Sequence, residues 1–151
     1  MIFEVVVAQK LLQIGFSLTD TKWCGTGNIA MDYEDLGSEI ETDKCCRSHD
    51  HCIDHIAAGE TKHNLTNTAF YSRLHCACDE EFRRCLRLAE TETSRKVKEI
   101  YFKILKTQCY KKDYPIIGCK YHQWLSGRCL EYELDTNGEQ FHQWFDVIDE
   151  E

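Results

Sequence analysis

The sequence predicts one mainly α-helical domain that is cross-linked by disulfide bonds. Ten cysteines among 151 residues can form five bridges, and disulfides persist in oxidising compartments, so we expect a secreted, extracellular protein. Three segments repeat apolar residues at helical spacing, whereas strict alternation occurs only near the C-terminus. These observations predict three helices and a small C-terminal β-hairpin, with residues 20–151 forming the domain.

The first helix is expected over residues 43–58, after a glycine-containing loop over residues 23–41. Thr42 and Asp43 are suitable N-cap residues, and Gly59 can end the helix. One face of this segment carries residues at three- and four-residue spacing, namely Cys46, His49, Ile53 and Ile56.

The second helix is expected over residues 68–88, where an apolar stripe lies opposite a charged face. That stripe is expected to face the first helix. A third helix is expected to begin at Thr93 or Ser94, either of which can cap it, and to reach about Gln108. Its apolar face is predicted to carry Tyr101 among aliphatic residues.

The pattern changes after Pro115, the only proline of the chain. Apolar residues alternate over residues 130–134, and Asn137-Gly138 is a strong hairpin-turn signal before residues 141–145. We therefore predict that these two segments pair with each other as a β-hairpin.

The formal net charge of −8 argues against nucleic acid as a partner, because nucleic-acid binding depends on basic side chains that neutralise phosphates. An acidic surface also favours zwitterionic over anionic membranes. The apolar runs Val5 to Ala8 and Leu11 to Phe16 are too short to span a bilayer. We therefore expect no transmembrane segment.

Residues 1–19 make a poor signal peptide, because Glu4 and Lys10 interrupt their apolar runs. We interpret them as a leader or pro-segment. The single sequon, Asn64-Leu65-Thr66, makes Asn64 a candidate for glycosylation on the secretory route.

The run from Cys45 to Cys52 reads Cys-Cys-Arg-Ser-His-Asp-His-Cys and places a histidine beside an aspartate within a frame of cysteines. An imidazole is the natural base for activating water near neutral pH, so His49 is the candidate base. Asp79, on the second helix, can accept the hydrogen bond from the other ring nitrogen if the two helices are antiparallel and cross-linked. Asp50 lies about 100° further round the first helix and can bind a hard cation.

The loop Trp23-Cys24-Gly25-Thr26-Gly27 supplies further oxygen ligands. Its two glycines permit backbone conformations that turn successive carbonyl oxygens toward one point, and Ca²⁺ favours carbonyl and carboxylate oxygens. This loop with Asp50 is a chemically sensible calcium site. A zinc site at His51 and His55 is the alternative metal interpretation, but no third ligand stands out, so we expect these two side chains to be solvated.

Six sequence motifs are informative when they are taken together. They are Trp23-Cys24-Gly25-Thr26-Gly27-Asn28, Cys45-Cys46-Arg47-Ser48-His49-Asp50-His51-Cys52, Leu65-Thr66-Asn67-Thr68, Cys76-Ala77-Cys78-Asp79, Gln108-Cys109-Tyr110-Lys111 and Gln143-Trp144-Phe145-Asp146. Together they resemble secreted phospholipase A2 of the bee-venom (group III) type, over about residues 20–147. Residues 28–42 and 121–125 match the resemblance only loosely.

The resemblance implies a phospholipase A2-like fold with an antiparallel helix pair carrying the active site. It implies a monomer that binds phospholipid membrane surfaces peripherally and uses Ca²⁺ to hydrolyse the sn-2 ester of glycerophospholipids. His49 would be the base, Asp79 its orienting carboxylate, and Tyr101 a support for Asp79. The metal ligands would be the carbonyls of Trp23, Gly25 and Gly27 with the carboxylate of Asp50, and the Gly25 amide would assist the oxyanion.

The same resemblance implies the disulfide pairing, which spacing alone does not choose. The implied pairs are Cys24 with Cys46, Cys45 with Cys85, Cys52 with Cys78, Cys76 with Cys109, and Cys119 with Cys129. Candidates for the membrane-facing rim are apolar or aromatic residues, namely Ile2, Phe3, Ile29, Met31, Tyr33, Ile56 and Phe70.

Two alternatives to an enzyme stay open at this point. One is a phospholipase-like ligand that has lost activity, against which intact His49, Asp50 and Asp79 argue. The other is a disulfide-rich binding module without an active site. Both alternatives predict that no lipid is hydrolysed.

Overall fold

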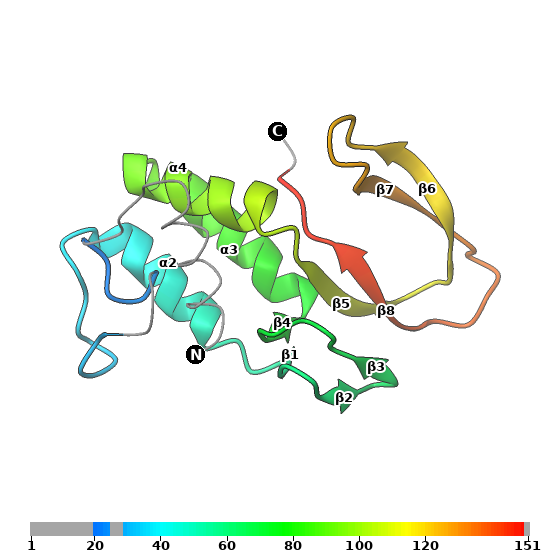
Figure 1. Cartoon of the computed structure of the whole chain (residues 1–151), viewed down its shortest axis with the longest axis horizontal. Helices are drawn as coiled ribbons and strands as arrows, with labels where there is room; N and C mark the ends of the chain where they lie inside the picture. Colours follow the sequence, from blue (N-terminus) through cyan, green and yellow to red (C-terminus); the bar gives the residue numbers. More distant parts are fainter. Residues whose placement is uncertain (1–19, 25–28, 150–151) are drawn as a thin grey trace.

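The computed structural model describes residues 20–24 and 29–149 (Figure 1). In this part of the chain the α-helices lie toward one end of the molecule and the long strands toward the other. The helices are α2 (Ile40–Asp50), α3 (Cys76–Ala89) and α4 (Glu92–Glu99), which continues into a π-helical turn, η1 (Ile100–Ile104). The strands are β1 (His55–Ile56), β2 (Thr61–Lys62), β3 (Leu65–Thr66), β4 (Arg73–Leu74), β5 (Gln108–Asp113), β6 (Ile116–His122), β7 (Cys129–Leu134) and β8 (Phe141–Asp146).

Two disulfides hold α2 and α3 side by side in opposite directions. Cys45, in the middle of α2, is bonded to Cys85, in the second half of α3, while Cys52, just after α2, is bonded to Cys78, early in α3. The other three bridges are Cys24–Cys46, Cys76–Cys109 and Cys119–Cys129. These are the five pairs that the resemblance implies, and together they use all ten cysteines.

The first helix differs from its predicted bounds. It spans Ile40–Asp50 instead of residues 43–58, so Thr42 and Asp43 lie inside its first turn, fully buried, and are not N-cap residues. The apolar spacing that suggested a longer helix does not mark a buried helical face, since Ile53 is 92% exposed. After Cys52, which is disulfide-bonded to Cys78 of α3, the chain leaves the helix and continues into the short strand β1.

The second helix begins at Cys76, later than the predicted residue 68. The preceding residues form two small antiparallel ladders, β1 with β4 and β2 with β3. Asn67, fully buried, holds this region in place: its amide nitrogen donates to the carbonyls of Ile56 (2.9 Å) and Tyr71 (2.7 Å), and its oxygen accepts from the amide of Ala69. The Asn67 side chain thus pairs with backbone carbonyl and amide groups that, in a helix, would pair with other backbone groups.

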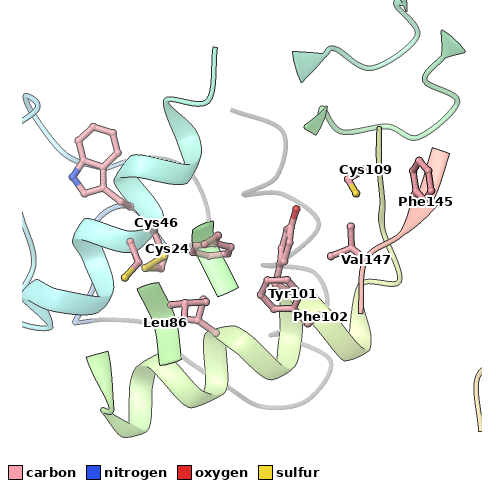
Figure 2. Close-up of a cluster of buried hydrophobic side chains, with 12 residues drawn as sticks. Cys24, Cys46, Leu86, Tyr101, Phe102, Cys109, Phe145 and Val147 are labelled. Atoms are coloured by element: carbon pink, nitrogen blue, oxygen red, sulfur yellow. A yellow bond between two sulfur atoms is a disulfide. The ribbon is translucent and has the colours of Figure 1, made fainter. Parts of the chain in front are cut away.

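The third helix begins earlier than predicted and ends irregularly. Its N-cap is Thr91 rather than Thr93 or Ser94, and Thr91 forms a capping box in which Ser94 is the N3 residue. After Glu99 the hydrogen bonding changes to that of a π-helix, which brings three consecutive residues, Ile100, Tyr101 and Phe102, into buried positions. Phe102 and Tyr101 belong to a core cluster that includes Leu86 and extends to Phe145 and Val147, as Figure 2 shows.

The predicted pairing of residues 130–134 with residues 141–145 is wrong. β7 pairs with β6, and β8 pairs with β5, each as an antiparallel two-stranded ladder. The predicted turn at Asn137-Gly138 does exist, with the Gly138 amide donating to the Asp135 carbonyl at 3.1 Å. It joins strands of two different ladders, which contact each other through side chains: the Tyr132 hydroxyl accepts from the Asp146 amide at 2.8 Å. Alternation identified the strands but carries no information on which strand is the partner.

No helix in residues 20–24 or 29–149 is both long and apolar enough to cross a membrane. The leader or pro-segment expected over residues 1–19, and the glycines Gly25 and Gly27, lie outside the residues that the structure describes. Among the candidate rim residues, Ile29, Met31, Tyr33 and Phe70 are exposed, whereas Ile56 is fully buried. Ile56 is therefore a core residue and not part of a membrane-facing rim.

Candidate active site

His49 and Asp79 face each other across the α2–α3 pair. His49 lies one residue before the end of α2, and Asp79 lies in the first turn of α3. The His49 Nε2 and Asp79 Oδ1 atoms are 2.7 Å apart, and both side chains are almost fully buried, with exposed fractions of 3% and 4%. A buried imidazole with one nitrogen held by a carboxylate has a fixed ring orientation, as a histidine base requires.

Tyr101 meets the same carboxylate from the third helical segment. Its hydroxyl donates to Asp79 Oδ1 at 2.5 Å, so Oδ1 serves both the tyrosine and the histidine. Burial first, and then the charge of Asp79, raise the pKa of the Tyr101 hydroxyl well above its ordinary value. Tyr101 is therefore a neutral donor at any physiological pH.

Aromatic rings enclose the imidazole. The Phe82 ring stacks on His49 with ring centroids 4.1 Å apart and an interplanar angle of 20°, and the Tyr101 ring meets it edge-on at 5.0 Å. Phe82 lies three residues after Asp79 on α3, so one helix supplies both the carboxylate and the stacking ring. The role of Phe82 was not predicted from the sequence, because helical spacing does not say which buried ring contacts which group.

Of the sequence-predicted metal ligands, Trp23 and Asp50 lie within the described residues, whereas Gly25 and Gly27 do not. Asp50, the last residue of α2, is partly exposed and close enough to Tyr101 for its charge to contribute to the raised tyrosine pKa. Trp23 is buried and is tied into place through the adjacent Cys24–Cys46 bridge. Ca²⁺ prefers carboxylate and carbonyl oxygens, so the Asp50 carboxylate and the Trp23 carbonyl are suitable donor types.

Asp43 anchors this loop, a role that sequence analysis missed. Its Oδ1 accepts from the backbone amide of Trp23 (2.7 Å), both carboxylate oxygens lie 3.0 Å from the amide nitrogen of Lys22, and Oδ2 accepts from the amide of Gly37 (2.8 Å). Gly37 is necessary here because a Cβ atom would lie 2.2 Å from the Asp20 carbonyl oxygen. The signal in the sequence, an acidic residue at the start of a helix, suggested a cap for its own helix instead.

The zinc interpretation of His51 and His55 finds no support in their contacts. The Nδ1 atom of His51 lies 2.8 Å from the Arg47 carbonyl oxygen, and that of His55 lies 3.1 Å from the Cys52 carbonyl oxygen. Within the described residues, no three His, Cys, Asp or Glu side chains gather as metal ligands. The sequon residue Asn64 is exposed in the turn between β2 and β3, with a positive φ of 62°.

Comparison with known proteins agrees with this geometry. A family described as Phospholipase A2 matches residues 17–113. A phospholipase A2 of Bombus pensylvanicus is 53% identical over 129 residues, which cover 85% of this chain and 95% of that protein. The Apis dorsata enzyme is 48% identical over 128 residues (84% of this chain, 94% of that protein), and the Apis mellifera enzyme is 45% identical over 128 residues (84% and 75%).

The matches span the cysteine frame, the His49-Asp50 pair and Asp79, and thus the residues on which the resemblance was first based. The non-enzymatic alternatives are therefore set aside. The chain belongs to the phospholipase A2 family, as a secreted enzyme of the bee-venom (group III) type.

Proposed function

We propose that this phospholipase A2 hydrolyses the sn-2 ester of glycerophospholipids at a membrane surface in a calcium-dependent reaction, releasing a fatty acid and a lysophospholipid. The observation that carries the proposal is the buried contact of 2.7 Å between His49 and Asp79. A carboxylate that holds one ring nitrogen leaves the other to act on water.

In this mechanism Asp79 accepts a hydrogen bond from the Nε2–H group of His49 and so fixes the tautomer. The Nδ1 atom then takes a proton from the attacking water and later returns it to the leaving alkoxide. Tyr101 holds the carboxylate in position, and Phe82 and Tyr101 keep bulk water away from the imidazole. The antiparallel α2–α3 pair, cross-linked by two disulfides on either side of the His49–Asp79 contact, is the frame that carries these groups.

The metal ligands we infer are the carboxylate of Asp50 and the backbone carbonyls of Trp23, Gly25 and Gly27. A bound Ca²⁺ ion would supply positive charge that polarises the ester carbonyl and stabilises the oxyanion. The amide of Gly25 would donate to the same oxyanion. Support comes from the way Asp43 and the Cys24–Cys46 bridge hold the start of the loop against α2.

We further infer a secreted monomer that binds membranes peripherally. The five disulfides agree with an oxidising compartment. Residues 1–19 are proposed to be a leader or pro-segment, so that residues 20–151 form the working domain. Asn64 is proposed to carry a glycan, because the sequon lies in an exposed turn.

The test uses oxidised protein and vesicles of phosphatidylcholine with different acyl chains at sn-1 and sn-2. Release of the sn-2 chain alone, abolished by a calcium chelator and restored by added Ca²⁺, is expected. Asp50→Asn should raise the Ca²⁺ concentration for half-maximal rate by about tenfold or more, because a charged ligand becomes neutral. Glu41→Gln, an exposed neutralisation on the same helix, is the matched control. Chelator-resistant hydrolysis would overturn the calcium mechanism.

A further inference from the structure

The tip of the β6–β7 hairpin exposes a cluster of large apolar side chains. The exposed fraction is 92% for Trp124, 87% for Leu125 and 63% for Tyr121. Figure 1 shows this hairpin at the opposite end of the molecule from α2. The contacts of His49 and Asp79 described above come from α2, α3 and η1 and not from this hairpin. Large apolar side chains that are exposed to water mark a surface that binds another molecule or a membrane.

The tip is held in a defined shape. The Cys119–Cys129 bridge closes the base of the loop. Above it, the amide of Gln123 donates to the Arg128 carbonyl at 2.7 Å, and the amide of Gly127 donates to the Gln123 carbonyl at 2.8 Å. A pre-shaped tip loses little conformational entropy when it becomes buried, which favours its use as an anchor.

The charge of this segment differs from that of the rest of the chain. Residues 114–130 contain no aspartate or glutamate, although the protein has 26 acidic residues and a net charge of −8. The two basic residues of the segment are paired with acids outside it, Lys120 with Glu131 at 3.2 Å and Arg128 with Asp146 at 3.5 Å, so the tip itself carries little net charge. A bilayer surface, which bears phosphate groups, would repel most of this acidic protein more than it would repel the hairpin.

The side-chain chemistry fits a lipid interface better than a protein groove. Tyrosine and tryptophan each combine an apolar ring with one polar group, and they concentrate at the headgroup level of membranes. Leu125 beside Trp124 adds a purely apolar side chain that can reach the acyl region. The enzyme acts on phospholipid, so its substrate already brings it to a bilayer surface.

We propose that Tyr121, Trp124 and Leu125 insert into the interfacial layer of phosphatidylcholine membranes and anchor the enzyme at a second point, separate from its active site. This inference rests on the proposed action at a membrane surface. It was not accessible from the sequence, where residues 121–125 stood out only as a loose match and the expected rim residues lay elsewhere.

The first experiment measures binding to vesicles of ether-linked phosphatidylcholine, which the enzyme cannot hydrolyse. The double variant Trp124→Ser/Leu125→Ser should bind about tenfold or more weakly than the parent, because two apolar side chains no longer leave water. Leu88→Ser is the matched control, since Leu88 is an exposed apolar side chain (71% exposed) that lies on α3, outside the hairpin. Hydrolysis of short-chain phosphatidylcholine below its micelle concentration should be the same in all three proteins.

The second experiment uses vesicles with bromine-labelled acyl chains, which quench tryptophan at short range. The parent should be quenched, and Trp124→Phe, which keeps an apolar ring but removes this fluorophore, should lose most of that quenching. Equal binding and equal quenching for parent and variants would overturn the proposal while leaving the interfacial function intact. A parent that fails to bind vesicles at all would instead overturn the interfacial function. Self-association that disappears in the double variant, with vesicle binding unchanged, would assign the tip to a second copy of the chain.

Discussion

The Oδ1 atom of Asp79 lies 2.7 Å from Nε2 of His49, although the two residues are 30 positions apart in the sequence. The contact exists because a disulfide flanks it on each side, Cys45–Cys85 toward one end of the helix pair and Cys52–Cys78 toward the other. Tyr101 completes it by donating to the same oxygen. The carboxylate is thus held by covalent cross-links as well as by its hydrogen bonds.

Replacing His49 by glutamine should remove the base and little else. Glutamine can still donate to Asp79 and fill most of the space against Phe82, so we expect a loss in kcat of about a hundredfold or more with little change in Tm. Turnover of short-chain phosphatidylcholine and thermal unfolding are the measurements. His55→Gln, an exchange at an exposed histidine, should leave both unchanged. A large fall in Tm for His49→Gln would assign His49 a structural role.

Asp79 and Tyr101 should differ in the size of their effects. Asp79→Asn removes the charge that fixes the histidine tautomer, and we expect kcat to fall about a hundredfold or more. Tyr101→Phe removes one hydrogen bond of about 1 kcal/mol, which corresponds to roughly a fivefold loss. Steady-state kinetics of both variants give the comparison. Equal losses would show that the tyrosine hydroxyl takes part in the chemistry directly.

Asp43→Asn should destabilise the loop that precedes α2. The Asp43 carboxylate accepts hydrogen bonds from the backbone amides of Lys22, Trp23 and Gly37. An asparagine side chain keeps one acceptor oxygen but replaces the other with an NH₂ group, which donates and cannot accept. We expect the free energy of unfolding to fall by about 3 kcal/mol, and the Ca²⁺ requirement of the enzyme to rise. Glu39→Gln, which neutralises an acid one turn earlier, serves as the control in denaturant unfolding. A variant as stable as the control would rule out the anchoring role of Asp43.

Tyr110 should make stability fall at alkaline pH. Burial, and then the hydrogen bond to Asp54, raise the pKa of the Tyr110 hydroxyl far above its ordinary value of 10.0. A raised pKa in the folded state means that stabilisation is present below pH 10 and is lost as pH rises above it. The stability difference between parent and Tyr110→Phe should therefore be about 1.4 kcal/mol smaller at pH 11 than at pH 9. A difference that is constant across this range would contradict the assignment.

Two disulfides of similar type should have different effects on catalysis. Cys52→Ser/Cys78→Ser opens a bridge next to Asp79, whose sequence separation is 26, and should cost about 3.5 kcal/mol of stability as well as lower kcat. Cys119→Ser/Cys129→Ser opens a bridge of separation 10 in the β6–β7 hairpin and should cost about 2.7 kcal/mol, with kcat on short-chain lipid unchanged. Conditions in which both variants remain folded allow the comparison of kcat. An unchanged kcat in the first variant would show that Asp79 is positioned without the bridge.

The sequence was most informative where chemistry and local pattern coincide. His49, Asp50 and Asp79 were identified because cysteines frame them, whereas the role of Tyr101 followed only from the family resemblance. The prediction of a long first helix was wrong because Ile53 and Ile56 have the same spacing but opposite environments, one exposed and one fully buried. Local spacing does not record which side chains find a partner.

The pairing of the strands depended on contacts that lie far apart in the chain. A turn at Asn137-Gly138 suggested a local hairpin, yet β8 pairs with β5, about thirty residues earlier. Asp43 was misassigned for a related reason. Its partners Lys22 and Trp23 precede it by about twenty residues, and no short-range pattern connects a buried carboxylate with distant backbone amides.

The π-helical turn Ile100–Ile104 limits how this chain can change in length. Such a turn contains one residue more than an α-helix would use for the same span, and Tyr101 lies within it. Deleting one residue there would restore regular α-helical geometry over the same span and leave the flanking segments in place. Successive residues of an α-helix point about 100° apart, so three neighbours such as Ile100, Tyr101 and Phe102 could no longer all be buried as they are now. A substitution in this turn changes one contact, whereas a one-residue deletion would force the packing of the core and the support of Asp79 by Tyr101 to compete.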